Sequence, residues 1–188
     1  MQKLHMICAL FVLVSANIVA GQVVSFGLCP RNIKTVQDFD VGSYLGTWYE
    51  ISKYPFVFEA GGRCVQAEYG ALTNKTISVV NSQLSGRDNT QSSIDGIAKI
   101  VGPGKLSVRF NGFASLAGDA PYWVLGTDYA NYAVVYSCKN LVLARSENVW
   151  ILARERNPDE DIVKAAQDVL AANKVSLAPL IVTDQTDC

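Results

Sequence analysis

The sequence predicts an all-β domain of antiparallel strands with one α-helix near its C-terminus. Three observations support this prediction: apolar and polar residues alternate in the middle of the chain, turn residues separate the alternating segments, and one late segment repeats its apolar residues with helical spacing. The chain lacks the strand–helix alternation that is typical of a parallel sheet. Eight strands at short spacing fit either a meander closed into a barrel or a sandwich.

Three of the strands show period-two alternation. In Val65-Gln66-Ala67-Glu68-Tyr69 the polar residues fall on even positions, so the odd positions share one face. Residues 94–99 and 106–110 alternate in the same way. Five further segments are rich in β-branched or aromatic residues: 47–53, 76–84, 122–127, 132–138 and 148–154. All eight segments are expected to be half-buried antiparallel strands.

The helix is expected to follow the last strand. Asn157 is a suitable N-cap, and Pro158 suits the first helical position. The acidic residues 159–161 place negative charge at the positive end of the helix dipole, so we interpret them as capping rather than as a carboxylate site. Apolar residues then recur on one face: Ile162, Val163, Ala166, Val169 and Leu170. This stripe predicts a helix packed on the outside of the sheet.

Residues 1–21 are expected to be a secretory signal peptide, and residues 22–188 to form a single domain. Lys3 and His5 precede a short apolar run, and the small-residue exit Val19-Ala20-Gly21 follows it. The apolar run is shorter than the roughly 20 residues of a membrane-spanning helix. The mature chain is therefore predicted to be secreted and extracellular.

Composition argues against several classes of function. His5 is the only histidine, and the only methionines are Met1 and Met6. Cleavage of the signal peptide would therefore leave the mature chain without histidine or methionine. That chain could provide no imidazole base, no histidine ligand for a metal, and no histidine or methionine ligand for a haem. No metal site and no enzyme activity are expected. Because 16 basic and 17 acidic residues give a net charge of −1, nucleic acid is not an expected partner either.

Four cysteines follow the predicted signal: Cys29, Cys64, Cys138 and Cys188. An even number at wide spacing in a secreted chain predicts two disulfides, and three pairings are open.

Asn74 begins the sequence Asn74-Lys75-Thr76 in a predicted turn. It is the N-glycosylation site that the sequence predicts.

Three short motifs, in order, resemble the signature of the lipocalin family. Gly46-Thr47-Trp48-Tyr49-Glu50 comes first, Thr127-Asp128-Tyr129 follows, and Arg154 ends the last strand. Longer stretches such as Trp150-Ile151-Leu152-Ala153-Arg154 are similar to the apolipoprotein D group of that family, including its insect members. The resemblance implies an eight-stranded up-and-down barrel with a ligand cavity at one end. It also implies that Arg154 lies over Trp48 as a structural plug of the other end.

The resemblance to the apolipoprotein D group implies the pairing Cys29–Cys138 and Cys64–Cys188. No thiol would then be left for covalent attachment, so a hydrophobic ligand is expected to bind reversibly, with no required cofactor. The family suggests fatty acids, sterols, retinoids, bilin pigments and related lipids as ligands. The alternative is a lipocalin-type enzyme, or a protective or interaction protein that acts on lipids or on a protein partner.

Alternation along the strands also predicts the side chains that face the cavity. Because Arg154 points inward, Trp150 and Leu152 share its face. The other alternating strands and the family pattern complete the predicted ligand-binding set: Trp150, Tyr122, Tyr69, Phe110, Asn81, Val108, Val79, Ala67, Leu152 and Phe58. The predicted lining contains no Lys, Asp or Glu, which favours a mainly apolar ligand.

Two apolar loops are predicted at the mouth of the cavity. One is Tyr54-Pro55-Phe56-Val57-Phe58, followed by Gly61-Gly62, and the other carries Phe113 and Leu116. Two roles are open for them: a lid over the cavity, which we favour, or an exposed patch that docks onto a lipid particle, a membrane surface or a receptor.

Overall fold

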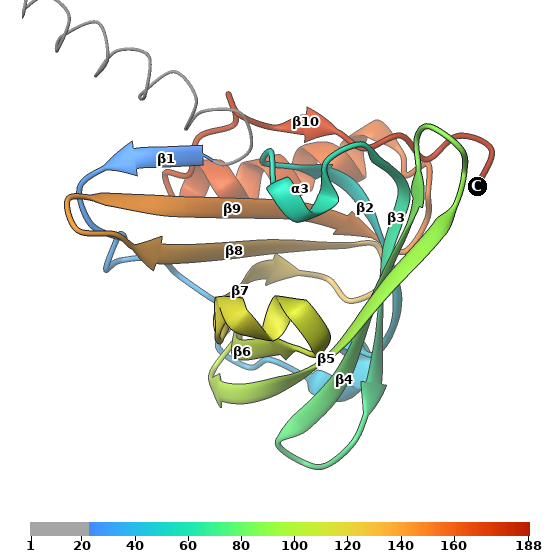
Figure 1. Ribbon diagram of the computed structural model, residues 1–188. Coiled ribbons are helices and arrows are strands. Elements are labelled where there is room, and N and C mark those ends of the chain that lie inside the picture. The colour runs from blue at the N-terminus through green and yellow to red at the C-terminus, as the bar shows by residue number, and fades with distance from the viewer. Residues whose placement is uncertain (1–22) are drawn as a thin grey trace, which may run out of the picture.

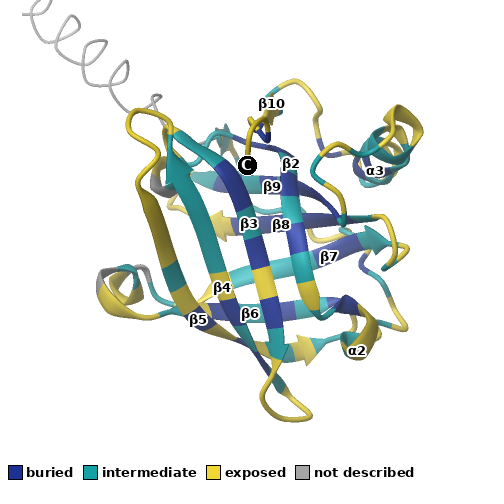
Figure 2. Ribbon diagram, turned by 90° about the vertical axis from the view of Figure 1, so that its right-hand side faces the viewer, coloured by how far each residue is buried: buried dark blue, intermediate teal, exposed yellow. Residues whose placement is uncertain are grey.

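The protein is a closed antiparallel β-barrel with one helix on its outer wall. The computed structural model describes residues 23–188, so the predicted signal peptide lies outside the described residues. Strands β2 to β9 follow one another around the wall in chain order, and β9 pairs back with β2 to close it. Figure 1 shows the strands of this wall, and Figure 2 shows helix α3 outside it. The predicted all-β class is confirmed, and the barrel rather than the sandwich is formed.

Each of the eight predicted segments forms a strand of the wall. The strands are β2 (Gly46–Lys53), β3 (Gly62–Ala71), β4 (Thr76–Ser85), β5 (Gln91–Gly102), β6 (Lys105–Phe110), β7 (Ala120–Thr127), β8 (Tyr132–Asn140) and β9 (Ala144–Ala153). Along the middle of β3, buried residues alternate with more exposed ones, as Figure 2 shows. The alternation in the sequence therefore distinguishes the inner face of the barrel wall from its outer face.

Several short elements were not predicted. Strand β1 (Val23–Phe26) pairs with β9, and β10 (Ile181–Val182) pairs with β2. The connections hold the helical turn α2 (Val41–Tyr44) and the 3₁₀ helices η1 (Val57–Glu59) and η2 (Gly112–Ala117). These elements are too short for a periodic pattern, so the sequence gives no clear indication of them.

Helix α3 (Glu160–Ala172) packs on the outer wall, as predicted. Ala166 and Leu170 are fully buried, and the helix contacts β7, β8 and β9. Gly126 of β7 permits this close approach, because an added Cβ there would lie 2.9 Å from Val169.

The predicted start of α3 is wrong. The N-cap is Asp159, and its side chain makes no capping hydrogen bond. The backbone explains this: the amides of Ile162 and Val163 donate to the Asp159 carbonyl, and Asp159 itself is extended. Asn157 and Pro158 therefore precede the cap. Glu160 and Asp161 do lie in the first turn, where negative charge stabilises the helix dipole.

Trp48 and Arg154 plug one end of the barrel, which we call the closed end. The Trp48 side chain is fully buried, and its Nε1 donates to the Tyr44 carbonyl at 2.8 Å. The Arg154 Cζ atom lies 3.7 Å from the centre of the indole ring, in cation–π contact. The guanidinium also donates to four backbone carbonyls, those of Ser43, Leu45, Thr47 and Tyr129. One side chain thus ties the start of β2 to the turn before β8.

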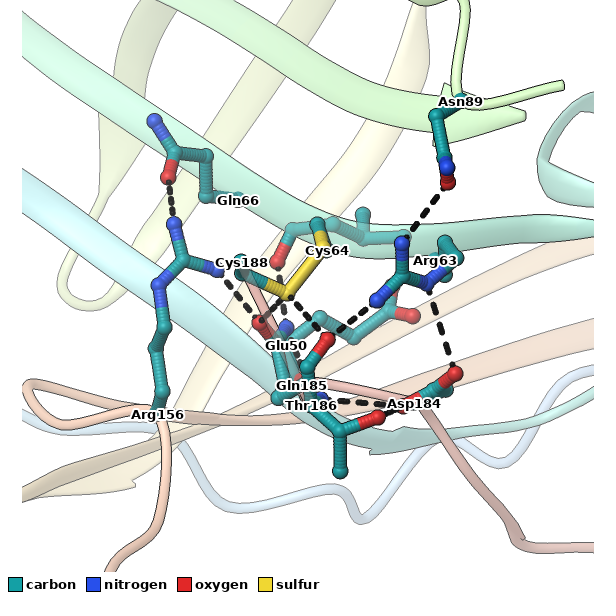
Figure 3. Close-up of a disulfide and its surroundings, with 11 residues drawn as sticks. Glu50, Arg63, Cys64, Gln66, Asn89, Arg156, Asp184, Gln185, Thr186 and Cys188 are labelled. Atoms are coloured by element: carbon teal, nitrogen blue, oxygen red, sulfur yellow. Dashed lines mark hydrogen bonds and ion pairs between the residues drawn. A yellow bond between two sulfur atoms is a disulfide. The ribbon is translucent and has the colours of Figure 1, made fainter. Parts of the chain in front are cut away.

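The other end of the barrel is called the open end. Near it, the C-terminal tail fills a gap in the wall. Strands β2 and β3 pair only as far as Tyr49 and Gln66, and the tail fills the gap beyond. Gln185 Nε2 bridges the strands by donating to the Glu50 and Val65 carbonyls, both at 2.8 Å. Figure 3 shows this contact beside the disulfide that fixes the tail.

The two disulfides have the pairing that the family resemblance implied. Cys29 is joined to Cys138, which fixes the N-terminal segment to β8. Cys64 is joined to Cys188, which fixes the tail to β3. Both bridges therefore hold a chain end against the barrel wall.

Candidate ligand cavity

A hollow occupies the open half of the barrel, above a closed half that is filled by side chains. It encloses about 770 Å³, counting the space at its open mouth. Nine predicted residues line it: Trp150, Tyr122, Tyr69, Phe110, Asn81, Val108, Val79, Ala67 and Leu152. The tenth, Phe58, lies in η1, and its side chain is outside the described part. Whether these residues contact a ligand stays a prediction.

Phe56 covers part of this hollow. Its ring lies edge-on to that of Trp150, with the ring centres 6.0 Å apart. Both side chains line the cavity. Val57, the next residue, is 55 % exposed, so the loop turns one side chain in and one out. This arrangement is consistent with the lid.

Tyr54 does not belong to the mouth, contrary to the sequence prediction. Its ring is 3 % exposed and packs in the outer core near Val175. Its hydroxyl donates to the Ser176 carbonyl. The segment after α3 supplies this partner, and nothing in the local sequence around Tyr54 indicates it. Leu116 is 78 % exposed on η2, and the Phe113 side chain is not described.

Three tyrosine hydroxyls form a hydrogen-bonded row beneath the hollow. Tyr122 Oη lies 2.7 Å from both Tyr44 Oη and Tyr69 Oη. Burial raises the pKa of all three hydroxyls, so they stay protonated. Tyr44 was not predicted as part of this row because it lies on α2, outside the strands where alternation identifies the inner face.

Two carboxylates line the cavity, so the prediction of a lining without Lys, Asp or Glu is wrong. Glu50 follows Trp48 on the inner face of β2, and Glu59 comes from η1. The Lys53 Nζ atom lies 2.9 Å from Glu50 Oε1 and 2.8 Å from Glu59 Oε2. Thr183 of the tail also donates to Glu50. The alternation that places Trp48 inside also places Glu50 inside, so this residue could have been found from the sequence.

Burial dominates the titration of Glu50. Loss of hydration raises its pKa from 4.5 to about 8, and the nearby Glu59 adds to the rise. The hydrogen bond from Thr183 and the contact with Lys53 oppose the rise but do not cancel it. Near neutral pH a large fraction of Glu50 is therefore protonated.

Stability is consequently expected to fall as the pH rises from about 4.5 to about 8. In that range the folded chain keeps a proton on Glu50 that the unfolded chain releases, so the stabilisation is complete at the acidic end and is lost above the folded pKa. Urea unfolding at several pH values measures it. Glu50→Gln should show a smaller pH dependence than the wild type, and identical slopes would contradict this assignment.

The described residues contain no group of three His, Cys, Asp or Glu side chains that could hold a metal ion. Among the described helices, none is long and apolar enough to cross a membrane.

Comparison with known proteins gives one consistent result. The model of the Lipocalin-like domain family matches residues 39–185. Apolipoprotein D of Cavia porcellus is 42% identical over 172 residues, which cover 89% of this chain and 88% of that protein. Lazarillo protein of Schistocerca americana is 34% identical over 158 residues, with 80% and 72% covered. The insecticyanin structure from Manduca sexta has a TM-score of 0.76 at 28% identity, covering 89% of this chain and 91% of that one. The chain therefore belongs to the lipocalin family.

Proposed function

We propose that this protein is a secreted carrier, formed by residues 22–188, that binds a small hydrophobic molecule reversibly inside its barrel. The observation that carries the proposal is an open hollow with a largely apolar wall above a plugged, filled end. Aromatic rings such as Trp150 and Phe110 line this hollow together with apolar side chains such as Val108. Such a wall binds apolar molecules by removing their surface from water. Fatty acids, sterols, retinoids, bilins and related lipids are the candidate ligands.

The cysteines support reversible binding and an extracellular location. All four that follow residue 21 are paired in disulfides, which leaves no thiol among them for covalent attachment. Disulfides persist in oxidising compartments, in agreement with secretion through the signal peptide proposed at residues 1–21. Asn74 is exposed in the turn between β3 and β4, where a glycan would have access.

The polar groups in the cavity favour a carrier function over enzyme activity. The hydroxyl of Tyr122 is shared with two other tyrosines, and Glu50 is bonded to both Lys53 and Thr183. No histidine or cysteine is among the described residues that line the cavity, and these side chains are common choices for a general base or a nucleophile. We therefore propose that the ligand leaves the cavity unchanged.

Ligand addition is expected to quench tryptophan fluorescence through Trp150. Titration with retinol or decanol should give a saturable change in the wild type and a much smaller one in Trp150→Phe, because this indole lines the cavity. Trp123→Phe is the matched control: Trp123 packs against Tyr136 and lies under Lys105, away from the cavity lining. Equal responses in both variants would contradict the proposed site.

We also propose that the open end docks onto a lipid surface. The turn between β8 and β9 exposes Leu141, Val142 and Leu143, with Val142 92 % exposed and Leu143 71 % exposed. Phe26 of β1, which is 87 % exposed, joins them through the pairing of β1 with β9. Strand β8 runs from the closed end to this turn, so the patch lies at the same end as the cavity mouth. Such a patch is typical of a binding surface.

Replacing Val142 and Leu143 together with serine is expected to reduce binding to phosphatidylcholine vesicles. The substitutions remove exposed apolar surface and leave the cavity lining unchanged. Val101→Ser on β5, where the valine is 62 % exposed, is the control and should bind like the wild type. Vesicle flotation measures the effect. Equal flotation of the double variant and the wild type would show that the patch does not dock onto lipid.

A further inference from the structure

No lysine or arginine is among the described residues that line the cavity, and the polar groups of this lining are carboxyls, amides and hydroxyls. Glu50 and Glu59 contribute carboxyl groups, and Asn81 and Asn148 contribute amides. The nearest described ammonium group, that of Lys53, is bound to both carboxyl groups. Lys53 itself is absent from the lining. With Glu50 largely protonated near neutral pH, the carboxylate that a bound molecule meets is Glu59, which is paired with Lys53.

Two of these acceptors have no hydrogen-bond partner. Asn81 Oδ1 and Asn148 Oδ1 are closed to water and unpaired. A smaller hollow beside the cavity shares Glu59 and Asn81 with it and adds Gln83, whose Oε1 is also buried and unpaired. Buried polar atoms are nearly always paired in folded proteins, so unpaired ones in a cavity wall indicate a missing partner.

Glu59 determines which kind of ligand group can pair with the oxygens of the cavity wall. An amide can turn to present either its oxygen or its nitrogen, but an ionised carboxylate can only accept. A ligand carboxylate placed in the cavity would lose its hydration beside Glu59 without meeting a free cation. A hydroxyl or amino group would instead donate to these oxygens.

We propose that the ligand's polar end is a hydrogen-bond donor, a hydroxyl or an amino group, and not a carboxylate. Glu59 receives it, with the amides of Asn81 and Asn148 turned toward the bound group, and the apolar remainder lies against Trp150 and Phe110. This inference rests on the proposed carrier function. It narrows the candidate ligands to alcohols, sterols and amines, and it argues against fatty acids.

Three probes with the same alkyl chain test the inference: decanol, decylamine and decanoate, titrated near neutral pH with Trp150 fluorescence as the readout. Decanol and decylamine are expected to bind at least about tenfold more tightly than decanoate, a difference of about 1.4 kcal/mol. Calorimetry of the same series provides a second measurement that does not depend on the indole.

Three variants assign the effect to residues. Glu59→Gln removes the charge, so it should weaken decylamine several-fold and strengthen decanoate. Asn148→Leu removes an acceptor at similar volume and should weaken decanol. Glu68→Gln is the matched control, because Glu68 is exposed on β3 and absent from the lining, and it should leave all three affinities unchanged. Thermal melting of each variant checks that it is folded.

The outcomes separate this inference from the carrier function. If decanoate binds as tightly as the other two probes, or if Glu59→Gln changes none of the affinities, the donor preference is wrong and the carrier function stands. If none of the three probes binds the wild type, the carrier function fails and the donor preference fails with it.

Discussion

Trp48→Ala is expected to lower the free energy of unfolding by about 3–5 kcal/mol, the usual cost of truncating a fully buried aromatic residue. Trp48 is 0 % exposed and packs against Tyr44, with the ring centres 5.2 Å apart. Its removal would also take away the surface on which Arg154 stacks. The guanidinium would then lie over a void at the closed end.

Urea unfolding followed by circular dichroism measures this loss. Trp123→Ala is a useful comparison because Trp123 is only partly buried, on the outer face of the wall. We expect it to cost less than Trp48→Ala. A Trp48→Ala protein as stable as the wild type would show that the indole does not plug the barrel.

Removing the second disulfide is expected to cost about 2–5 kcal/mol. Cys64 and Cys188 are 124 residues apart, so the bridge restricts a long loop of the unfolded chain. Without the disulfide, the tail would also be held less firmly at the place where Gln185 donates to the carbonyls of β2 and β3. The double substitution Cys64→Ser with Cys188→Ser leaves no odd thiol.

Urea unfolding of this double variant should be compared with that of Cys29→Ser with Cys138→Ser. Both should be less stable than the wild type. Only the first should loosen the open end, because Thr183 and Gln185 bond there to Glu50. Hydrogen exchange at β10 would detect the loosening. Unchanged stability and exchange would show that the tail is held without its disulfide.

The strands and the inner face of the barrel could be predicted because their signals are local. Alternation along β3 identifies Ala67 and Tyr69 as inward residues whatever their partners are. The plug needed the family resemblance as well, since Trp48 and Arg154 are far apart in sequence. Their contact follows from barrel closure, in which Tyr49 of β2 pairs with Ala153 of β9.

Features that the sequence did not predict occur mainly where segments far apart in the chain determine the local structure. Tyr54 turns outward because the chain after α3 provides a carbonyl for its hydroxyl. Strand β10 forms only where β2 and β3 separate. The apolar patch at 141–143 lies in a hairpin turn, where no period distinguishes exposed from buried residues. Glu50 is different, because its inward position follows from the alternation on β2.

A crystal structure of the protein grown with decanol tests the central claim most directly. We expect density for one molecule inside the barrel, with its chain against Trp150 and Phe110 and its hydroxyl at Glu59, Asn81 or Asn148. Density only on the outer surface, or a barrel whose open half is packed solid with its own side chains, would contradict the carrier function.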